Sequence, residues 1–218
     1  KLDTIGRTLD VVAFTNVFNR NPNTKSNALE NNVGSYNNFS NDFGLLNYYL
    51  KYDFAIPFEK QKFSINTGGK FNTIKVNNTG TYNLNSSIAN VIDFDYKETN
   101  LAFYVEARKK IKKFNFTAGL RYEDFNVNRI GIVSNTRTDI DFKNKNLFPN
   151  FSALYEVNPS VNVSASYSRK ISQPSYSVLD PNGSNIDQYN SSSGNLLLNP
   201  SFFDNYEFKI SAMDFIQL

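Results

Sequence analysis

Residues 46–58 read LNYYLKYDFAIPF, and apolar side chains occupy every second position of this stretch. The apolar set consists of Leu46, Tyr48, Leu50, Tyr52, Phe54, Ile56 and Phe58. After a short polar break, residues 63–71 (FSINTGGKF) repeat the alternation. A period of two over this length predicts β-strands with one apolar and one polar face.

These two stretches predict a hairpin. If residues 59–60 form a two-residue turn, Ile56 faces Phe63, and the apolar side chains of both strands share one face. Two more hairpins with the same parity are predicted around the polar turns at residues 110–113 and 158–160. Single strands are expected over residues 8–19, whose apolar residues do not separate onto one face, and over residues 205–216. We therefore expect eight antiparallel strands.

The other connections are long and polar. They are rich in Asn, Ser, Gly and Asp, and they cover residues 21–42, 83–97, 134–146 and 174–203. Structureless loops of this length are uncommon in compact soluble domains. Short turns at one end of the strands and long loops at the other are typical of outer-membrane barrels, with the turns on the periplasmic side and the loops outside the cell.

The composition excludes much known chemistry. The 218 residues include no Cys and no His, so thiolate sites, His-centred triads and zinc fingers are excluded. A carboxylate-only metal or glycosidase site remains formally open, but no pair of carboxylates stands out as an acid/base couple. A net charge of +3 is too small to indicate nucleic-acid binding. We expect a protein that is not an enzyme and has no cofactor.

The apolar face points either to the core of a soluble sandwich or to lipid, and three features favour lipid. The predicted strands exceed the usual length in globular sheets. Aromatic residues gather near strand ends, as in an interfacial girdle, at Tyr48, Tyr49, Phe58, Tyr122, Phe151 and Tyr167. The polar face carries charges in mid-strand, at Lys51, Asp53, Lys70, Glu106, Arg108, Arg121, Glu123 and Arg169. We predict that these eight residues are lumen charges of a transmembrane β-barrel.

An ordered set of short motifs spans about 170 residues. Its members are KYDFAIPF (51–58), AGLRYE (118–123), LFPN (147–150), SYSRKISQPSY (166–176), LDP (179–181), GN (194–195), LNP (198–200) and YE (206–207). Together they resemble the Bacteroidetes-type outer-membrane β-barrel family of the TonB-dependent receptor superfamily. The resemblance implies an all-β, antiparallel barrel in the bacterial outer membrane.

The resemblance also implies that the chain is a portion of something larger. Family members carry a plug domain and a TonB box, and neither is recognisable here; nor is a signal peptide. Their barrels continue for many strands beyond the position that matches Tyr206-Glu207. We expect residues 1–218 to be a single, incomplete barrel domain of about eight strands. A shortened homologue that closes on eight strands is the alternative.

The lumen charges have two interpretations: they line a substrate path, or they form cross-strand ion pairs that hold the strands together. The loop over residues 174–203 is a candidate for ligand recognition through Tyr176, Asp180, Asp187 and Tyr189, or it is simply solvated. Asp180 and Asp187 lack the regular spacing of a calcium loop, so no metal site is predicted. Arg169 and Lys170 either bind a lipopolysaccharide phosphate or end a strand in solvent.

Two functions follow from the resemblance. The first is a TonB-dependent-receptor-like transporter, whose extracellular loops capture a ligand and whose lumen passes it inward. The second is a barrel that transports nothing and serves as a structural subunit of an outer-membrane assembly or secretion complex. A soluble carbohydrate-binding sandwich is a third option. The expected partners are outer-membrane lipid and lipopolysaccharide, a plug domain and TonB, and other envelope proteins, but not nucleic acid.

Overall fold

The computed structural model describes residues 6–30, 33–84, 87–182, 184–185 and 191–212. The strands are β1 (Thr8–Arg20), β2 (Asn23–Glu30), β3 (Val33–Phe58), β4 (Phe63–Leu84), β5 (Ser87–Ile111), β6 (Phe114–Val133), β7 (Thr136–Asn158), β8 (Val161–Ser172), β9 (Ser184–Asn185), β10 (Ser191–Ser192) and β11 (Ser201–Ala212). Two short helices are present, η1 (Glu59–Gln61) and α1 (Tyr176–Leu179). Among the described residues, no helix is long and apolar enough to cross a membrane.

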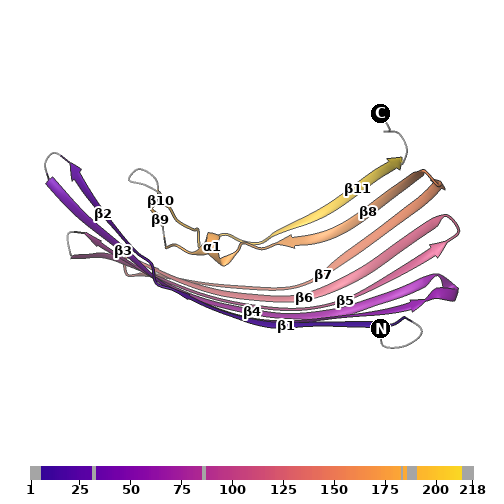
Figure 1. The fold of residues 1–218 in the computed structure, drawn as a ribbon, viewed down its shortest axis with the longest axis horizontal. Helices are drawn as coiled ribbons and strands as arrows, with labels where there is room; N and C mark the ends of the chain where they lie inside the picture. Colours follow the sequence, from indigo (N-terminus) through magenta and orange to yellow (C-terminus); the bar gives the residue numbers. More distant parts are fainter. Residues whose placement is uncertain (1–5, 31–32, 85–86, 183, 186–190, 213–218) are drawn as a thin grey trace.

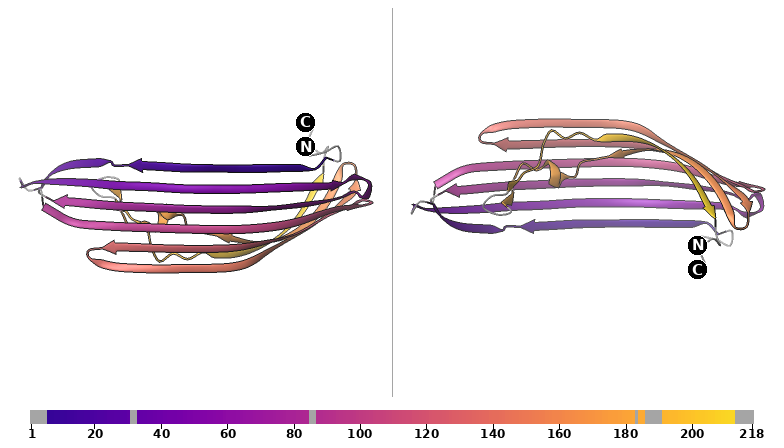
Figure 2. Two further views of the ribbon diagram at one scale, coloured as in Figure 1. Left: turned by 90° about the horizontal axis from the view of Figure 1, so that it is seen from below. Right: turned by 90° about the horizontal axis from the view of Figure 1, so that it is seen from above.

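One antiparallel sheet contains the long strands. Its order is β1-β3-β4-β5-β6-β7-β8-β11, and β2 pairs with β3 beside this path. These eight strands confirm the expected all-β, antiparallel architecture. The sheet curves into a trough with a concave inner face and a convex outer face (Figures 1 and 2).

Three of the four predicted loops are wrong, because the chain there continues as strand. Residues 21–42 form β2 and the first part of β3, and residues 83–97 complete β4 and begin β5. Residues 134–146 contain only a tight turn at Ser134 and Asn135, both with positive φ, before β7 begins. Strand pairing needs only backbone hydrogen bonds. Strands that extend into water therefore need no apolar face, and their sequences resemble loops.

The first hairpin turn is longer than predicted. Phe58 pairs with Phe63 and Ile56 with Ile65, so four residues form the turn instead of two. Residues 59–61 form η1, and Lys62 adopts a left-handed conformation with its amide bonded to the carbonyl of Glu59 at 3.0 Å. Because the register shift is an even number of residues, every side chain keeps its predicted face.

The turn at residues 110–113 is tighter than predicted, because Ile111 already pairs with Phe114. The strand expected at residues 8–19 is confirmed as β1. It carries apolar residues on both faces: Phe14, on the inner face, stacks on Tyr49 at 4.7 Å between ring centroids. Tyr49 therefore points inward and does not belong to an outer aromatic girdle, whereas its neighbour Tyr48 is exposed on the outer face.

Large apolar side chains are exposed on the outer face near the short turns. We call this surface the apolar belt; its members include Leu50, Tyr52, Phe71, Leu101, Phe103, Val105, Leu120, Tyr122, Leu147 and Phe151. Val105 is 50% exposed and Leu147 54%. On β4 the belt extends from Phe63 to Phe71, which matches the roughly 9–11 residues that a tilted strand needs to cross a bilayer. A surface of this kind suits lipid and not water.

The buried core lies on the opposite side of the sheet. It is formed by Val76, Phe94, Tyr96, Phe125, Val127, Leu179 and Leu196. Five of these residues are on β4, β5 and β6 beyond the apolar belt, in the halves of the strands that lie far from the short turns. The other two come from the connection between β8 and β11, which therefore folds back onto the inner face.

Candidate functional site

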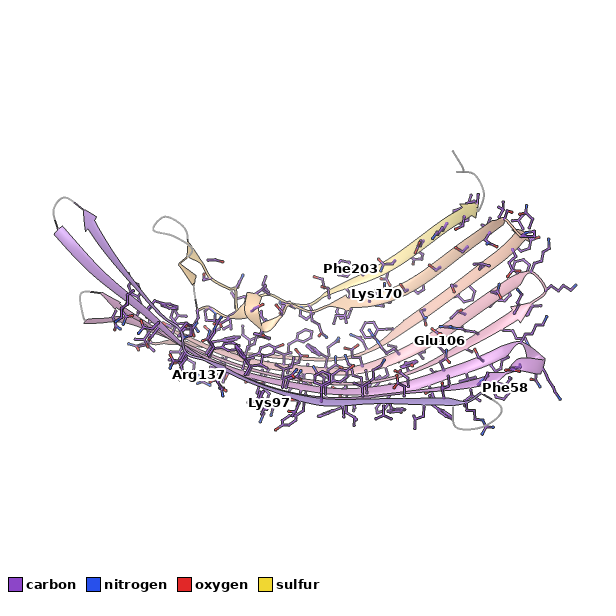
Figure 3. All side chains as sticks on the ribbon, viewed as in Figure 1. Phe58, Lys97, Glu106, Arg137, Lys170 and Phe203 are labelled. Atoms are coloured by element: carbon purple, nitrogen blue, oxygen red, sulfur yellow. The ribbon has the colours of Figure 1, made fainter. Side chains whose placement is uncertain are left out.

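The inner face beside the apolar belt carries most of the predicted lumen charges. Strand alternation places Lys51, Asp53, Lys70, Glu106, Arg108, Arg121 and Glu123 on this face. Figure 3 shows Glu106 on the concave side and Lys97 on the convex side. The charges pair along single strands: Lys51 with Asp53 at 2.6 Å, Arg108 with Glu106 at 2.8 Å, and Arg121 with Glu123 at 3.2 Å.

Neighbouring strands hold these acids in place. The Tyr104 hydroxyl donates to Asp53 Oδ1 at 2.6 Å, and Asn100 Nδ2 donates to Glu123 Oε1 at 2.6 Å. Glu123 is buried, and Arg121 also lies 4.8 Å above the ring of Phe148. The charges and their neighbours therefore form a network in which the ion pairs lie within single strands. The contacts between strands come from the neutral donors Tyr104 and Asn100 and from the ring of Phe148.

An open cavity of about 300 Å³ lies beside this network. It is lined by Thr8, Asp10, Asp53, Phe54, Ala55, Asn66, Tyr104, Glu106 and Arg108. Asp10 of β1 is directly opposite Asp53 of β3, which brings two carboxylates to one wall of the cavity. Among the described residues, no group of three His, Cys, Asp or Glu side chains is placed to hold a metal ion.

The prediction that Arg169 is a lumen charge is corrected by its position in β8. It occupies the same strand face as Tyr167, which pairs with the exposed Tyr206, and it pairs with Asp204. Arg169 is therefore not part of the row of inner-face charges. Its guanidinium lies 5.7 Å from the ring centroid of Phe202. The charge of Arg169 suggests the lumen, whereas the alternation of β8 from Val161 to Tyr167 places it on the outer face.

The connection between β8 and β11 folds into the trough. We call residues 173–182 and 191–200 the infolded segment (Figures 1 and 2). The sequence predicts a solvated extracellular loop here, and the structure corrects this prediction because the connection lies against the inner face. The segment has two limbs that are joined by backbone hydrogen bonds, from Gly194 N to Asp180 O and from Asn195 N to Val178 O, both at 2.9 Å.

The first limb is attached to β4 through Asp180. Asn78 Nδ2 donates to Asp180 Oδ2 at 2.5 Å, and the amide nitrogen of Asn182 donates to Asp180 Oδ1 at 2.9 Å. Asn182 Nδ2 also donates to the backbone carbonyl of Asn78 at 2.9 Å. Asp180 and Asn78 are buried, with 8% and 4% of their surfaces exposed. Burial raises the pKa of the Asp180 carboxyl, although the hydrogen bonds from Asn78 and Asn182 oppose this shift.

The second limb is attached to β6 through Arg129. The Arg129 guanidinium donates from Nη1 to the carbonyl of Leu198 and from Nη2 to Asn199 Oδ1 at 3.3 Å. Only 2% of Arg129 is exposed, and among the described residues it forms no ion pair with a carboxylate. Such a buried cation depends on its hydrogen-bond acceptors. Displacing the second limb would remove these acceptors.

Two glycines on the inner face let the segment approach the wall closely. A Cβ placed on Gly80 would lie 2.1 Å from Asn182 Oδ1, and one on Gly131 would lie 2.9 Å from Leu196 Cδ2. Gly80 is two residues beyond Asn78, and Gly131 is two residues beyond Arg129. Each attachment point therefore combines a polar anchor with a glycine on the same strand face.

Of the four predicted loop residues, the structure describes two. Tyr176 does not reach outward: its ring lies 6.2 Å from those of Phe43 and Tyr96 on the inner wall. Asp180 is buried, as described above. Asp187 and Tyr189 lie outside the described residues. The inner charges and the infolded segment occupy different levels of the same inner face.

Asn78 and Arg129 were missed as site residues. Arg129 continues the alternation of Arg121 and Glu123 along β6, and this alternation would have placed it on the inner face. Its partner Leu198 is 69 residues away, however, and the bond is to a backbone carbonyl, which no side-chain pattern reports. Asn78 likewise contacts Asp180 across 102 residues.

Solved structures with a similar fold are outer-membrane receptors. The ferric yersiniabactin uptake receptor FyuA of Yersinia pestis matches with a TM-score of 0.62 and 11% identity, over 96% of this chain and 31% of that one. FpvA of P. aeruginosa, solved with bound pyoverdines, matches with a TM-score of 0.64 and 16% identity, over 95% of this chain and 28% of that one. The ferric citrate transporter FecA gives a TM-score of 0.55 at 13% identity, over 78% and 26%.

These similarities show a shared fold. The chain spans about a quarter to a third of the length of these three receptors. No sequence match is found among curated proteins. The profile of the family described as "Outer membrane protein beta-barrel family" matches residues 1–218, which are the whole chain. With the exposed apolar belt and the TonB-dependent-receptor-like sheet, this match shows that the protein belongs to the outer membrane protein beta-barrel family and resides in the bacterial outer membrane.

Proposed function

We propose that this chain is part of a TonB-dependent-receptor-like transporter that binds a ligand on its extracellular side and passes it through the barrel. The observation that carries the proposal is the infolded segment. It occupies the inner face in the extracellular halves of the strands, where a ligand entering from outside would arrive. The solved structures of similar fold, among them the ferric citrate transporter FecA and the ferric yersiniabactin uptake receptor FyuA, support the same class of function. The proposal includes no enzymatic step.

On this proposal, the segment moves when the ligand passes. Its two limbs are attached by a few hydrogen bonds, at Asp180 and Arg129, and by the contacts of Leu179 and Leu196 with the wall. Net contributions of about 1 kcal/mol per hydrogen bond suit an element that docks and undocks. In the whole protein, a plug domain and TonB would supply the energy-coupled step.

A disulfide between Gly80→Cys and Asn182→Cys tests this movement. The Cβ position of Gly80 lies 3.2 Å from Asn182 Cγ, and the chain has no other cysteine. The full-length receptor is expressed in a strain that lacks its gene. Growth is then scored on a panel of ferric chelates and oligosaccharides as sole iron or carbon sources. We expect at least one source to require the receptor, and we expect oxidation of the double variant to abolish its use and reduction to restore it.

The two single-cysteine variants are the controls, since neither can form the bond. A receptor-dependent source that is used equally well with the oxidised disulfide would contradict movement of the segment. If deleting the gene affects the use of no source, the structural-subunit function is favoured instead. The same infolded segment would then be a permanent closure of the barrel, held by its buried apolar residues.

A further inference from the structure

Two lysines face each other on the outer surface just beyond the apolar belt. Lys75 of β4 is directly opposite Lys97 of β5. On β4 the last belt residue is Phe71, and on β5 it is Leu101, so each lysine is four residues beyond the belt on its own strand. Both side chains are exposed, and Figure 3 shows Lys97 on the convex side.

Within the described part of the chain, neither lysine forms an ion pair. The neighbouring acid on this face, Asp95, accepts a hydrogen bond from Asn77. Farther along the sheet, Lys145 of β7 pairs with Asp124 at 3.4 Å. Like charges directly opposite each other destabilise a sheet unless an anion lies between them.

Their depth relative to the belt identifies the anion. Four residues extend about 13 Å along a strand, which for a tilt of about 40° is roughly 10 Å along the membrane normal. Flexible lysine stems reach back part of this distance toward the lipid. The two ammonium groups therefore meet the headgroup layer of the extracellular leaflet. A phosphate group there offers three acceptor oxygens, enough to contact both lysines.

We propose that Lys75 and Lys97 form a clamp for a phosphate of outer-leaflet lipopolysaccharide. The site lies on the outer face, so this proposal does not depend on whether the barrel transports a ligand. It also differs from Arg169 and Lys170, the two cations that the sequence offers for the same chemistry. Lys170 lies one residue beyond Arg169 on β8, the penultimate strand of the sheet, far along the sheet from β4 and β5.

The test measures lipopolysaccharide that co-purifies with the full-length receptor from outer membranes in mild detergent. Two lysines near an anionic lipid surface account for roughly a tenfold or greater change in affinity. We therefore expect Lys75→Gln/Lys97→Gln to retain roughly tenfold less lipopolysaccharide per receptor, and Lys75→Arg/Lys97→Arg to retain the wild-type amount. In add-back to delipidated receptor, lipid A should bind the wild type, and enzymatically dephosphorylated lipid A should not.

The matched control is Lys60→Gln/Lys62→Gln, which removes the same charge at the turn between β3 and β4, on the periplasmic side. It should retain the wild-type amount of lipopolysaccharide. Circular dichroism of all variants confirms that the strands are intact. Equal retention by the Lys75→Gln/Lys97→Gln variant and the wild type would overturn the proposal. Equal binding of dephosphorylated lipid A would also overturn it, because acyl contacts alone would then explain the association.

Discussion

Asp180 is a buried carboxylate held by amide donors and not by a cation among the described residues. Its attachment to Asn78 connects the infolded segment to β4. Because burial raises the pKa of Asp180 above its ordinary value, the docked segment favours the protonated carboxyl. Protonation therefore contributes docking stability that is fully present below the ordinary carboxyl pKa and is lost as the pH rises through the raised value.

The variant Asp180→Asn should remove this pH dependence. An asparagine is neutral at every pH, and its side-chain oxygen can still accept from Asn78 Nδ2. We expect the wild-type segment to dock more weakly at neutral than at acidic pH, and the variant to dock equally at both. Hydrogen exchange of peptides covering residues 192–199, corrected for intrinsic rates, measures docking. A variant that keeps the wild-type pH dependence would show that another group is responsible.

The sequence offers Tyr176 and Asp180 as candidate ligand-binding residues on an exposed loop, whereas the structure places both against the inner face. Both residues lie in a stretch without apolar and polar alternation, and such a stretch predicts a solvated loop. What places them inside is tertiary structure: the buried anchors Asn78 and Arg129, and the glycines opposite the segment. These partners are 69 and more residues distant in sequence, so their contacts leave no local pattern.

At the scale of elements, Gly194 joins the two limbs of the infolded segment. Its amide donates to the carbonyl of Asp180, and a Cβ on Gly194 would lie 2.3 Å from that oxygen and 2.8 Å from Asp180 N. These are backbone atoms of the first limb, and they cannot rotate away. A side chain at this position must therefore separate the limbs.

Gly194→Ala should weaken docking by about 1–3 kcal/mol, the usual cost of overpacking. The Asn195 amide donates to Val178 O. Its hydrogen exchange should accelerate about tenfold for each 1.4 kcal/mol of docking free energy that is lost. The control is Gly44→Ala, whose Cβ would meet only Asn19 Oδ1, at 3.3 Å. This control should leave exchange in the segment unchanged. Equal, slow exchange in both variants would show that the limbs do not pack as described.

The alternation of apolar residues predicted the membrane-spanning parts of the strands and their facing. It failed beyond the belt for a physical reason: there the outer face meets water, and the inner face mixes the apolar core residues with polar anchors such as Asn78 and Arg129, so the regular alternation of the belt is lost. Residues 21–42, 83–97 and 134–146 therefore read as loops although their backbones pair as strands. The turn after Phe58 has four residues where the sequence predicts two. Because the difference is an even number, the side chains of β3 and β4 keep their predicted faces.

For the whole molecule, the outer and inner faces have separate tasks. The outer face presents the apolar belt to lipid and, on our proposal, Lys75 and Lys97 to phosphate. The inner face carries the charge network near the short turns and the infolded segment farther out. Composition and motifs predicted the class of protein and its location in the outer membrane. They did not predict that the connection between β8 and β11 lies inside.

Cross-linking in native outer membranes tests the position of the infolded segment most directly. The pair Gly80→Cys/Asn182→Cys bridges the segment and β4. The reference pair Thr73→Cys/Thr99→Cys bridges β4 and β5, where the two hydroxyl oxygens are 3.5 Å apart whatever the segment does. With mild oxidant and no added nutrient, we predict that both pairs form disulfides to a similar extent. A reference pair that links fully while the Gly80–Asn182 pair stays reduced would contradict an infolded segment on the inner wall.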